Sequence, residues 1–230
     1  AAFGAVFDPA VFRACRERLS QVADLTKYTT ELAVEDIDDV REALGYRKVL
    51  LWGGSYGTRV AQAYLRRFPD RVTAAVLDGV VPFDFDAPSG YARSLQQALD
   101  RVITDCRAFA ACHDSFPALE RDWARVLSLV RKGPVPARVK NQDSVGSVVR
   151  FSIGDLSYSV RGLLYRPQGA RALPGMIHRA AVSGDLSELA QRYWQRAADF
   201  GDFADGLHLS VLCAEDTRFI RDDQMAELVR

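Results

Sequence analysis

The sequence predicts an α/β protein whose parallel sheet is covered by helices on both faces. Two continuous apolar runs, 48–52 and 71–82, have the composition of strands that are buried on both sides. The segment between them, 58–68, carries apolar residues at helical spacing and stops at Pro69. A strand, a helix and a second strand in this order are typical of a parallel βαβ unit.

Length and composition fit one large domain or a core with an insertion. The chain has 230 residues, of which 48% are apolar, and its 30 basic residues are balanced by 30 acidic ones. Balanced charge creates no field that would steer the protein toward nucleic acid or an anionic membrane. No apolar run approaches the ~20 residues that span a bilayer, and no signal peptide is visible. We therefore expect no nucleic-acid partner and no membrane span, and the oligomeric state stays open.

Two helices are predicted before the first strand. Segment 9–22 has a basic amphipathic pattern, and segment 31–44 repeats apolar residues along one helical face. Thr29 or Thr30 can cap the second helix, acidic residues crowd its first turns, and Gly45 closes it. The strand at 48–52 follows directly.

That strand ends in Gly53-Gly54-Ser55-Tyr56-Gly57, a Gly-x-Ser-x-Gly sequence. Between a buried strand and a helix, this sequence is typical of a nucleophile elbow, a tight turn that exposes one serine hydroxyl above the sheet. Glycines two residues before and two residues after the serine allow strand and helix to pack closely. The pattern favours Ser55 as a nucleophile over the alternative, a plain glycine turn.

The pattern changes at about residue 83, where strands no longer alternate with helices. A break is expected at 133–136 and a short strand at 148–153. The predicted helices lie at 91–131, 156–165, 172–182 and 186–200. We therefore expect residues 1–82 to form an α/β core and residues 83–206 a mainly helical insertion over the sheet. Residues 207–213 have a β pattern and are expected to return the chain to the core over 207–230.

The four cysteines bear on the cellular compartment. Cys106 and Cys112 are close in sequence, and a zinc site would need more ligands than His113 supplies. A short-loop disulfide is favoured over free thiols and would indicate an oxidising compartment, so we expect a secreted or periplasmic protein. Whether Cys15 and Cys213 also pair is left open.

Several segments carry a resemblance to a known group. They are Tyr28-Thr29-Thr30, residues 36–46, 53–58, 76–80, 112–117 and 211–216. In these segments the chain resembles the proline iminopeptidase and tripeptidyl aminopeptidase family of α/β-hydrolases. The resemblance implies the α/β-hydrolase fold with a mainly helical cap, and a serine exopeptidase that removes amino acids or short peptides from free N-termini. It implies a peptide substrate, no metal or organic cofactor, and secretion in many bacterial members.

The resemblance also assigns roles to residues. Ser55 would attack the scissile carbonyl and form an acyl-enzyme, and the backbone N–H of Tyr56 would stabilise the oxyanion. Glu215 would bind the α-amine of the substrate, with a plain structural salt bridge as the alternative. Asp216 invites assignment as the acid of a catalytic triad, but its segment resembles the one that follows the cap in proline iminopeptidases.

The chain departs from the family where the remaining catalytic groups are expected. It contains no early His-Gly-Gly loop for the second oxyanion donor, and none of His113, His178 and His208 has a late Gly-His context. His113 and His178 fall in the expected cap, and His208 is expected to be a packed or surface residue. We therefore expect the middle of a longer hydrolase, incomplete at both ends, which lacks the triad Asp and His and is inert alone.

Two other functions stay open. An esterase or lipase-like α/β-hydrolase would share the elbow, and a non-catalytic binding module could retain the fold without a triad.

Overall fold

The computed structural model describes residues 9–85, 89–140, 145–199, 204–221 and 223–224. The chain divides into two compact units. The first, Arg13–Ala92 with Ala204–Arg230, contains a parallel sheet and is called the sheet unit below. The second, Ala1–Phe12 with Arg93–Phe203, is called the helical unit. The expected role of residues 83–206 as a cap over the active site stays a prediction.

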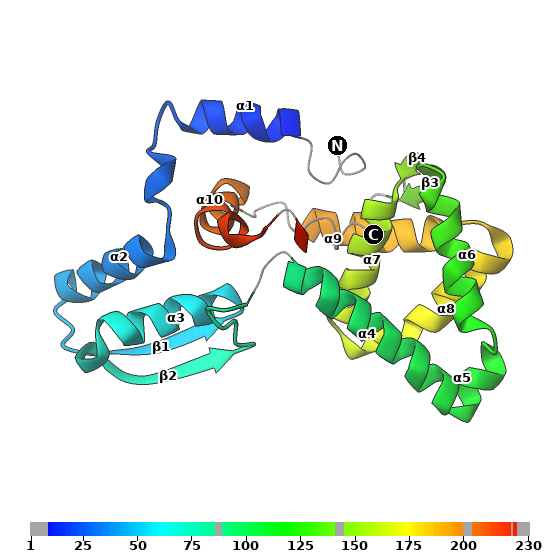
Figure 1. Ribbon diagram of the computed structural model, residues 1–230, viewed down its shortest axis with the longest axis horizontal. Coiled ribbons are helices and arrows are strands. Elements are labelled where there is room, and N and C mark those ends of the chain that lie inside the picture. The colour runs from blue at the N-terminus through cyan, green and yellow to red at the C-terminus, as the bar shows by residue number, and fades with distance from the viewer. Residues whose placement is uncertain (1–8, 86–88, 141–144, 200–203, 222, 225–230) are drawn as a thin grey trace. The chain divides into compact units, whose positions relative to one another are not determined.

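The sheet unit contains the predicted βαβ element. Strands β1 (Val49–Gly54) and β2 (Val72–Asp78) pair in parallel, with Gly54 opposite Asp78 (Figure 1). Helix α3 (Tyr56–Arg67) connects them and buries Ala61 and Tyr64. A 3₁₀ turn, Pro69–Arg71, ends the helical segment at the predicted proline. Side chains alternate between the two faces of a strand. The face of the sheet away from α3 carries Leu50, Trp52 and Val76, and all three side chains are exposed.

The N-terminal helices are also close to their predicted bounds. Helix α1 is Pro9–Leu19, and a 3₁₀ turn follows at Leu25–Lys27. Helix α2 (Thr30–Ala43) is capped at its N-terminus by Thr29, whose hydroxyl accepts a hydrogen bond from the Leu32 amide at 3.4 Å. The chain leaves α2 through Gly45, which has a φ of 71° in the left-handed region that glycine adopts without strain.

A buried carboxylate joins α2 to α3. Asp38, 4% exposed, accepts hydrogen bonds from the Tyr64 hydroxyl at 2.7 Å and from Arg41 Nε at 2.8 Å, and it also pairs with Arg71. The hydrogen bond from Arg41 lowers the pKa of Asp38 to about 2, burial opposes this, and Tyr64 and the charge of Arg71 add to it. This network fixes α3, the helix that follows the elbow serine, against α2.

Residues 207–213 form a helix, so the predicted strand is wrong. Helix α10 (Asp205–Glu215) contains the whole segment, and a 3₁₀ turn follows at Thr217–Phe219. A short apolar run does not by its periodicity separate a buried strand from a helix. In the structure the amides of His208 and Asp216 donate to the carbonyls four residues earlier, those of Ala204 and Leu212, at 3.0 and 3.1 Å, which is the hydrogen-bond pattern of an α-helix.

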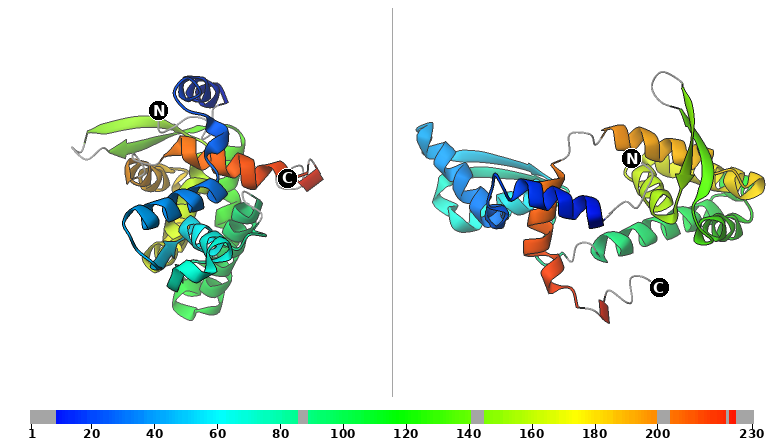
Figure 2. Two further views of the ribbon diagram at one scale, coloured as in Figure 1. Left: turned by 90° about the vertical axis from the view of Figure 1, so that its left-hand side faces the viewer. Right: turned by 90° about the horizontal axis from the view of Figure 1, so that it is seen from above.

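The helical unit holds a hydrophobic core of buried residues. Its elements are α4 (Ser89–Ala108), α5 (Ala110–Ser115), α6 (Leu119–Arg131), β3 (Val135–Lys140), β4 (Gly146–Phe151), α7 (Ile153–Leu164), α8 (Pro167–Ser183) and α9 (Ser187–Asp199). The antiparallel β3–β4 pair is visible as a twisted ribbon beside the helices of this unit (Figure 2). The core includes Leu99, Ile103, Val126, Val130, Phe151, Leu156, Leu173, Ile177 and Leu189.

Sequence reasoning found the helices of this unit and the second strand of the pair. It placed a break at 133–136, where β3 begins at Val135. The predicted final residue of the last helix, Phe200, lies outside the described residues.

The predicted disulfide between Cys106 and Cys112 is confirmed. Their Cα atoms are 5.0 Å apart, and the bond joins the end of α4 to α5. Within the described part of the chain, Cys15 and Cys213 form no disulfide. None of the helices between residues 9 and 224 that the structure describes is long and apolar enough to cross a membrane.

Candidate active site

Ser55 lies in the sharp turn between β1 and α3. Its φ of 53° and ψ of −121° are strained for a residue with a side chain, and it is the one non-glycine residue with a positive φ in the described ranges. The Ser55 amide donates to the carbonyl of Asp78 at the end of β2, at 2.9 Å. The residue itself is exposed. The turn therefore extends the sheet pairing by one residue and then reverses with the serine on the outside.

Gly53 makes this reversal sterically possible. A β-carbon at position 53 would lie 2.3 Å from the carbonyl oxygen of Gly57, a distance that real structures do not show. Position 57 differs, because a β-carbon there would meet no atom within 4 Å. The expectation that both glycines permit close packing is therefore confirmed for Gly53, whereas Gly57 contributes its backbone carbonyl to the contact.

The first turn of α3 is fixed by side-chain hydrogen bonds. Thr58, fully buried, donates its hydroxyl to the Ser55 carbonyl at 2.7 Å and accepts from the Val81 amide at 2.8 Å. Gln62 Nε2 donates to the carbonyls of Thr58 and Val81, both at 3.0 Å. These contacts tie the elbow to the segment that follows β2.

Tyr56 is the first residue of α3. At this position a backbone N–H has no acceptor four residues earlier in the helix, and the helix dipole makes it an attractive donor to an anion. The Tyr56 N–H is thus next to the serine hydroxyl in sequence and at the positive end of a helix, which is the arrangement of an oxyanion donor.

The Tyr56 side chain belongs to a hydrogen-bonded chain that ends at Glu215. Thr30 donates its amide to Glu215 Oε1 at 2.5 Å and its hydroxyl to Oε2 at 2.7 Å. Because that hydroxyl has a single proton, the Tyr56 hydroxyl donates to Thr30 Oγ1 at 2.7 Å. Burial raises the pKa of Tyr56, the hydrogen bond with Thr30 opposes this, and the charge of Glu215 adds to the rise.

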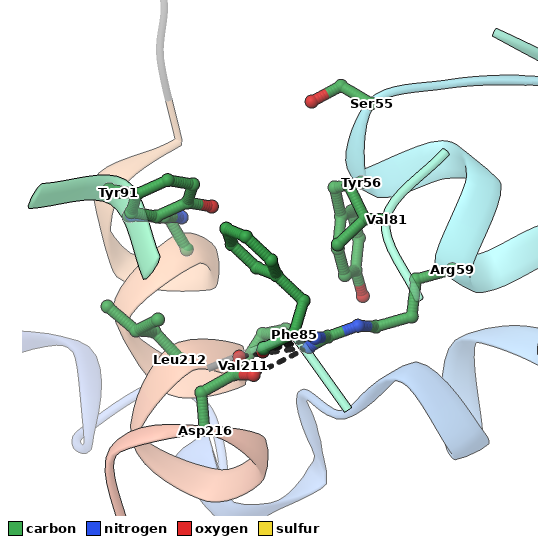
Figure 3. Close-up of a pocket in the computed structure, with 10 residues that line it drawn as sticks. Ser55, Tyr56, Arg59, Val81, Phe85, Tyr91, Val211, Leu212 and Asp216 are labelled. Carbon is green, nitrogen blue, oxygen red and sulfur yellow. Dashed lines mark hydrogen bonds and ion pairs between the residues drawn. The ribbon is translucent and has the colours of Figure 1, made fainter. Parts of the chain in front are cut away.

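A small pocket of about 60 Å³ opens beside the elbow. Figure 3 shows Ser55 at its edge, Tyr56 next to it, and aromatic and aliphatic side chains around it. Its lining comes from the elbow and α3, the segment after β2, the start of α4, and α10: Ser55, Tyr56, Arg59, Val81, Phe85, Tyr91, His208, Val211, Leu212 and Asp216. The pocket is therefore mostly apolar, with an ion pair in one wall.

That ion pair joins Arg59 of α3 to Asp216 at the end of α10. Arg59 Nη1 lies 2.9 Å from both carboxylate oxygens, and the two side chains are 6% and 8% exposed (Figure 3). A buried, charge-assisted contact of this kind fixes the geometry of both partners.

The predicted site residues are only partly brought together. Ser55 and Tyr56 line the pocket, whereas Glu215 contacts Thr30 and does not line it. His208, expected on a strand, lies on α10 and lines the Ser55 pocket.

The other two histidines lie in the helical unit. His178 forms a 2.7 Å contact with Asp122, and His113 lies on α5. Among the described residues, no group of three or more His, Cys, Asp or Glu side chains is suited to a metal ion.

Sequence reasoning missed Thr30, Thr58 and Arg59. Thr30 and Thr58 belong to segments that carry the family resemblance, but the sequence assigned neither of them a role in the site. Arg59 lies in the predicted helix, and nothing in its spacing distinguishes it from a surface arginine. Their partners are 185, 23 and 157 residues away, so only the fold identifies them.

Short segments of the chain are similar to curated bacterial hydrolases. It is 41% identical over 81 residues to "Serine protease Hip1" of Mycobacterium tuberculosis, which covers 34% of this chain and 16% of that protein. It is 36% identical over 85 residues to "Putative hydrolase YuaR" of Escherichia coli, covering 35% of this chain and 17% of that protein. It is 46% identical over 52 residues to "Proline iminopeptidase" of Neisseria gonorrhoeae, covering 23% of this chain and 17% of that protein. The matched segments thus span about a sixth of these relatives.

A broader match comes from a family profile. The profile described as alpha/beta hydrolase fold matches residues 13–156, which is more than half of the chain and includes the elbow. Together with the parallel β1–β2 pair and the strained serine between β1 and α3, this match leads to one conclusion: the chain belongs to the alpha/beta hydrolase fold family.

Proposed function

We propose that this chain carries the nucleophile of a serine hydrolase that cleaves amino acids or short peptides from free peptide N-termini. The observation that carries the proposal is Ser55, exposed and held at a φ of 53°. Strain of this kind costs of order 1–3 kcal/mol and persists where the surrounding structure imposes it, which is common at active sites.

In the proposed reaction Ser55 Oγ attacks the scissile carbonyl as its proton passes to a base. The carbon–nitrogen bond then breaks, and the amine takes up that proton and departs to leave an acyl-enzyme. The negative charge that develops on the carbonyl oxygen is stabilised by the Tyr56 N–H at the start of α3. Water then hydrolyses the ester bond and releases the acyl fragment. The proposal gives the nucleophile and one oxyanion donor to this chain, and it assigns the base and its carboxylate to none of the described residues.

The pocket supports a peptide substrate. Its apolar wall, which includes Phe85 and Leu212, lies directly beside the serine and suits the side chain of the residue whose carbonyl is attacked. The names of two relatives, a serine protease and a proline iminopeptidase, agree with peptide-bond cleavage.

Glu215 is the proposed anchor for the α-amine of the substrate. A carboxylate has about four lone-pair sites, and the two hydrogen bonds from Thr30 occupy two of them. The remaining sites can accept hydrogen bonds from an ammonium group. An exopeptidase needs such an anchor because it must reject substrates whose amine is blocked.

The test uses the full-length protein that contains this chain. Its Ser55→Ala variant is the control. We expect a fluorophosphonate to label the serine protein and not the alanine variant. We also expect tripeptide p-nitroanilides with free N-termini to be cleaved far faster than their N-acetylated forms and faster than p-nitrophenyl esters. Glu215→Gln should reduce the preference for a free amine.

Three results would contradict parts of this proposal. Absence of labelling would indicate a non-catalytic module, faster cleavage of esters would indicate an esterase, and equal cleavage of blocked peptides would exclude an exopeptidase. An unchanged amine preference in Glu215→Gln would remove the anchor role from that residue.

We further propose that the protein is exported to an oxidising compartment. The Cys106–Cys112 disulfide supports this, because such bonds persist mainly outside the reducing cytosol. Fractionation of the native host, followed by alkylation of free thiols with and without reduction, tests it. Recovery in the cytosolic fraction with both cysteines alkylated before reduction would refute it.

A further inference from the structure

Arg59 makes contact with three of the segments that form the Ser55 pocket. It extends from α3, and its Nη1 lies 2.9 Å from both carboxylate oxygens of Asp216, the residue that directly follows α10. Its Nη2 lies 3.4 Å from the carbonyls of Pro82 and Phe85. Val81 and Phe85 on one side, and Leu212 on the other, line the same pocket. The guanidinium is therefore placed where the walls of the pocket meet.

The burial of this group is unusual for a purely stabilising contact. Arg59 is 5% exposed, and in the part of the chain that the structure describes its Nε has no hydrogen-bond partner. Buried ion pairs are often replaced by apolar residues of similar volume without loss of stability, because removal of two charges from water is costly. An unpaired buried N–H adds to that cost. Stability alone is thus a weak reason for this arrangement.

The fork of the guanidinium gives it a different use. Nη1 contacts both oxygens of the Asp216 carboxylate, and Nη2 remains for the carbonyls of the segment after β2, so one planar group binds both segments. An apolar pair could fill the same volume, but it would not hold α10 and this segment at a defined spacing.

We propose that Arg59 is a positioning residue that sets the shape of the pocket beside Ser55 and hence the preference for a large apolar substrate side chain. The kinetic part of this inference rests on the proposed function. Arg59 acts through Phe85 and Leu212, which contact the substrate side chain, and it takes no part in bond making or breaking.

A double substitution distinguishes the positioning role of Arg59 from its contribution to the stability of the protein. Arg59→Met alone leaves the Asp216 carboxylate buried without a partner and should lower the melting temperature. Arg59→Met with Asp216→Leu removes both charges and should restore the melting temperature. Arg67→Met is the matched control, since Arg67 lies on the same helix with its side chain 61% exposed.

Selectivity is measured as the ratio of kcat/KM for phenylalanine p-nitroanilide to that for glycine p-nitroanilide. We expect the double variant to lose about 100-fold in kcat/KM for the phenylalanine substrate, the scale on which misplacement of about 1 Å acts. The losses in kcat/KM for the glycine substrate and in the rate of fluorophosphonate labelling should be clearly smaller than the loss for the phenylalanine substrate, since neither reagent fills the pocket. Arg67→Met should match the wild type throughout.

A second measurement does not depend on catalysis. In the Ser55→Ala background, titration calorimetry gives the affinity for phenylalaninamide, which the Arg59 and Asp216 substitutions should weaken about tenfold, or about 1.4 kcal/mol. If the wild type neither labels nor turns over but this affinity falls, the proposed function fails and the positioning role stands. If the double variant recovers its melting temperature together with its selectivity and affinity, Arg59 is structural only and the inference is overturned.

Discussion

The carbonyl oxygen of Gly57 occupies the space into which any side chain at Gly53 would project, with 2.3 Å between that oxygen and the β-carbon position. The backbone at Gly53 is fixed by the sheet pairing of β1, and the backbone at Gly57 is fixed by helix α3. Neither can move away without disrupting its element. The close approach of strand and helix is therefore built into the chain at a single residue. It is also the basis of the first prediction.

Gly53→Ala should destabilise the elbow, whereas Gly57→Ala should be tolerated. The first forces backbone apart at a cost of about 1–3 kcal/mol. The second meets no atom within 4 Å and adds a better helix former, worth up to about 1 kcal/mol. Urea unfolding and the rate of fluorophosphonate labelling measure both. Equal loss in the two variants would show that the contact does not govern the turn.

Ser55→Gly should be more stable than Ser55→Ala. A glycine adopts a φ of 53° without steric cost, while alanine keeps the strain of about 1–3 kcal/mol. The greater flexibility of glycine in the unfolded chain removes part of the gain, so we expect a net difference of about 1 kcal/mol. Neither variant has a nucleophile, so unfolding midpoints compare the net effect of strain and chain flexibility without any contribution from catalysis. A less stable glycine variant would contradict the strained geometry.

Asp38 should make the sheet unit sensitive to acid. Its folded pKa of about 2 is below the ordinary 3.8, so the unfolded chain binds its proton first as the pH falls. The contribution of Asp38 to stability is therefore complete above about pH 4 and is lost as the pH falls toward about 2. Asp38→Asn should cost about 3 kcal/mol near neutrality and abolish this dependence.

Urea unfolding across this pH range measures the effect, with hydrogen exchange on α2 and α3 to locate it. Glu35→Gln is the control, because its pair with Arg67 is exposed and should contribute less than about 1 kcal/mol. An Asp38→Asn variant with the same acid dependence as the wild type would contradict the assignment.

Removal of the disulfide should loosen the helical unit and leave the elbow intact. Replacement of Cys106 and Cys112 by alanine opens a loop with a sequence separation of 6, for which chain entropy predicts a loss of about 2 kcal/mol. Hydrogen exchange at α4 and α5 should become faster. Labelling of Ser55 should be unchanged, since the bond joins only these two helices; a loss of labelling would show that the elbow depends on it.

The elbow could be predicted because its signals are local. The order of strand, Gly-x-Ser-x-Gly and helix fixes the turn within a dozen residues, and each residue type has a steric or chemical reason to be there. The same holds for the cap of α2, which the sequence narrowed to Thr29 or Thr30 and the structure places at Thr29, and for the short disulfide, whose partners are close in sequence.

The segment 207–213 could not be assigned because its apolar run fits two structures equally well. Its backbone hydrogen bonds, which join residues four apart as in a helix, separate the two, and they cannot be read from the apolar run. Strand β3 was missed for a related reason, since the prolines at 134 and 136 indicate a break, whereas Pro136 lies within the two-stranded ribbon.

The remaining parts of the site depend on distant partners. Nothing in the sequence near Arg59 indicates that Asp216 lies against it, and nothing near Thr30 indicates Glu215. Such pairs join residues 157 and 185 positions apart, so local pattern and propensity cannot identify them.

Glu215 and Asp216 are consecutive, yet they reach in different directions, one to the start of α2 and the other to α3. Deletion of one residue from α10 would rotate everything after it by about 100° and carry both carboxylates away from their partners at once. The length of α10 is therefore expected to be fixed in evolution.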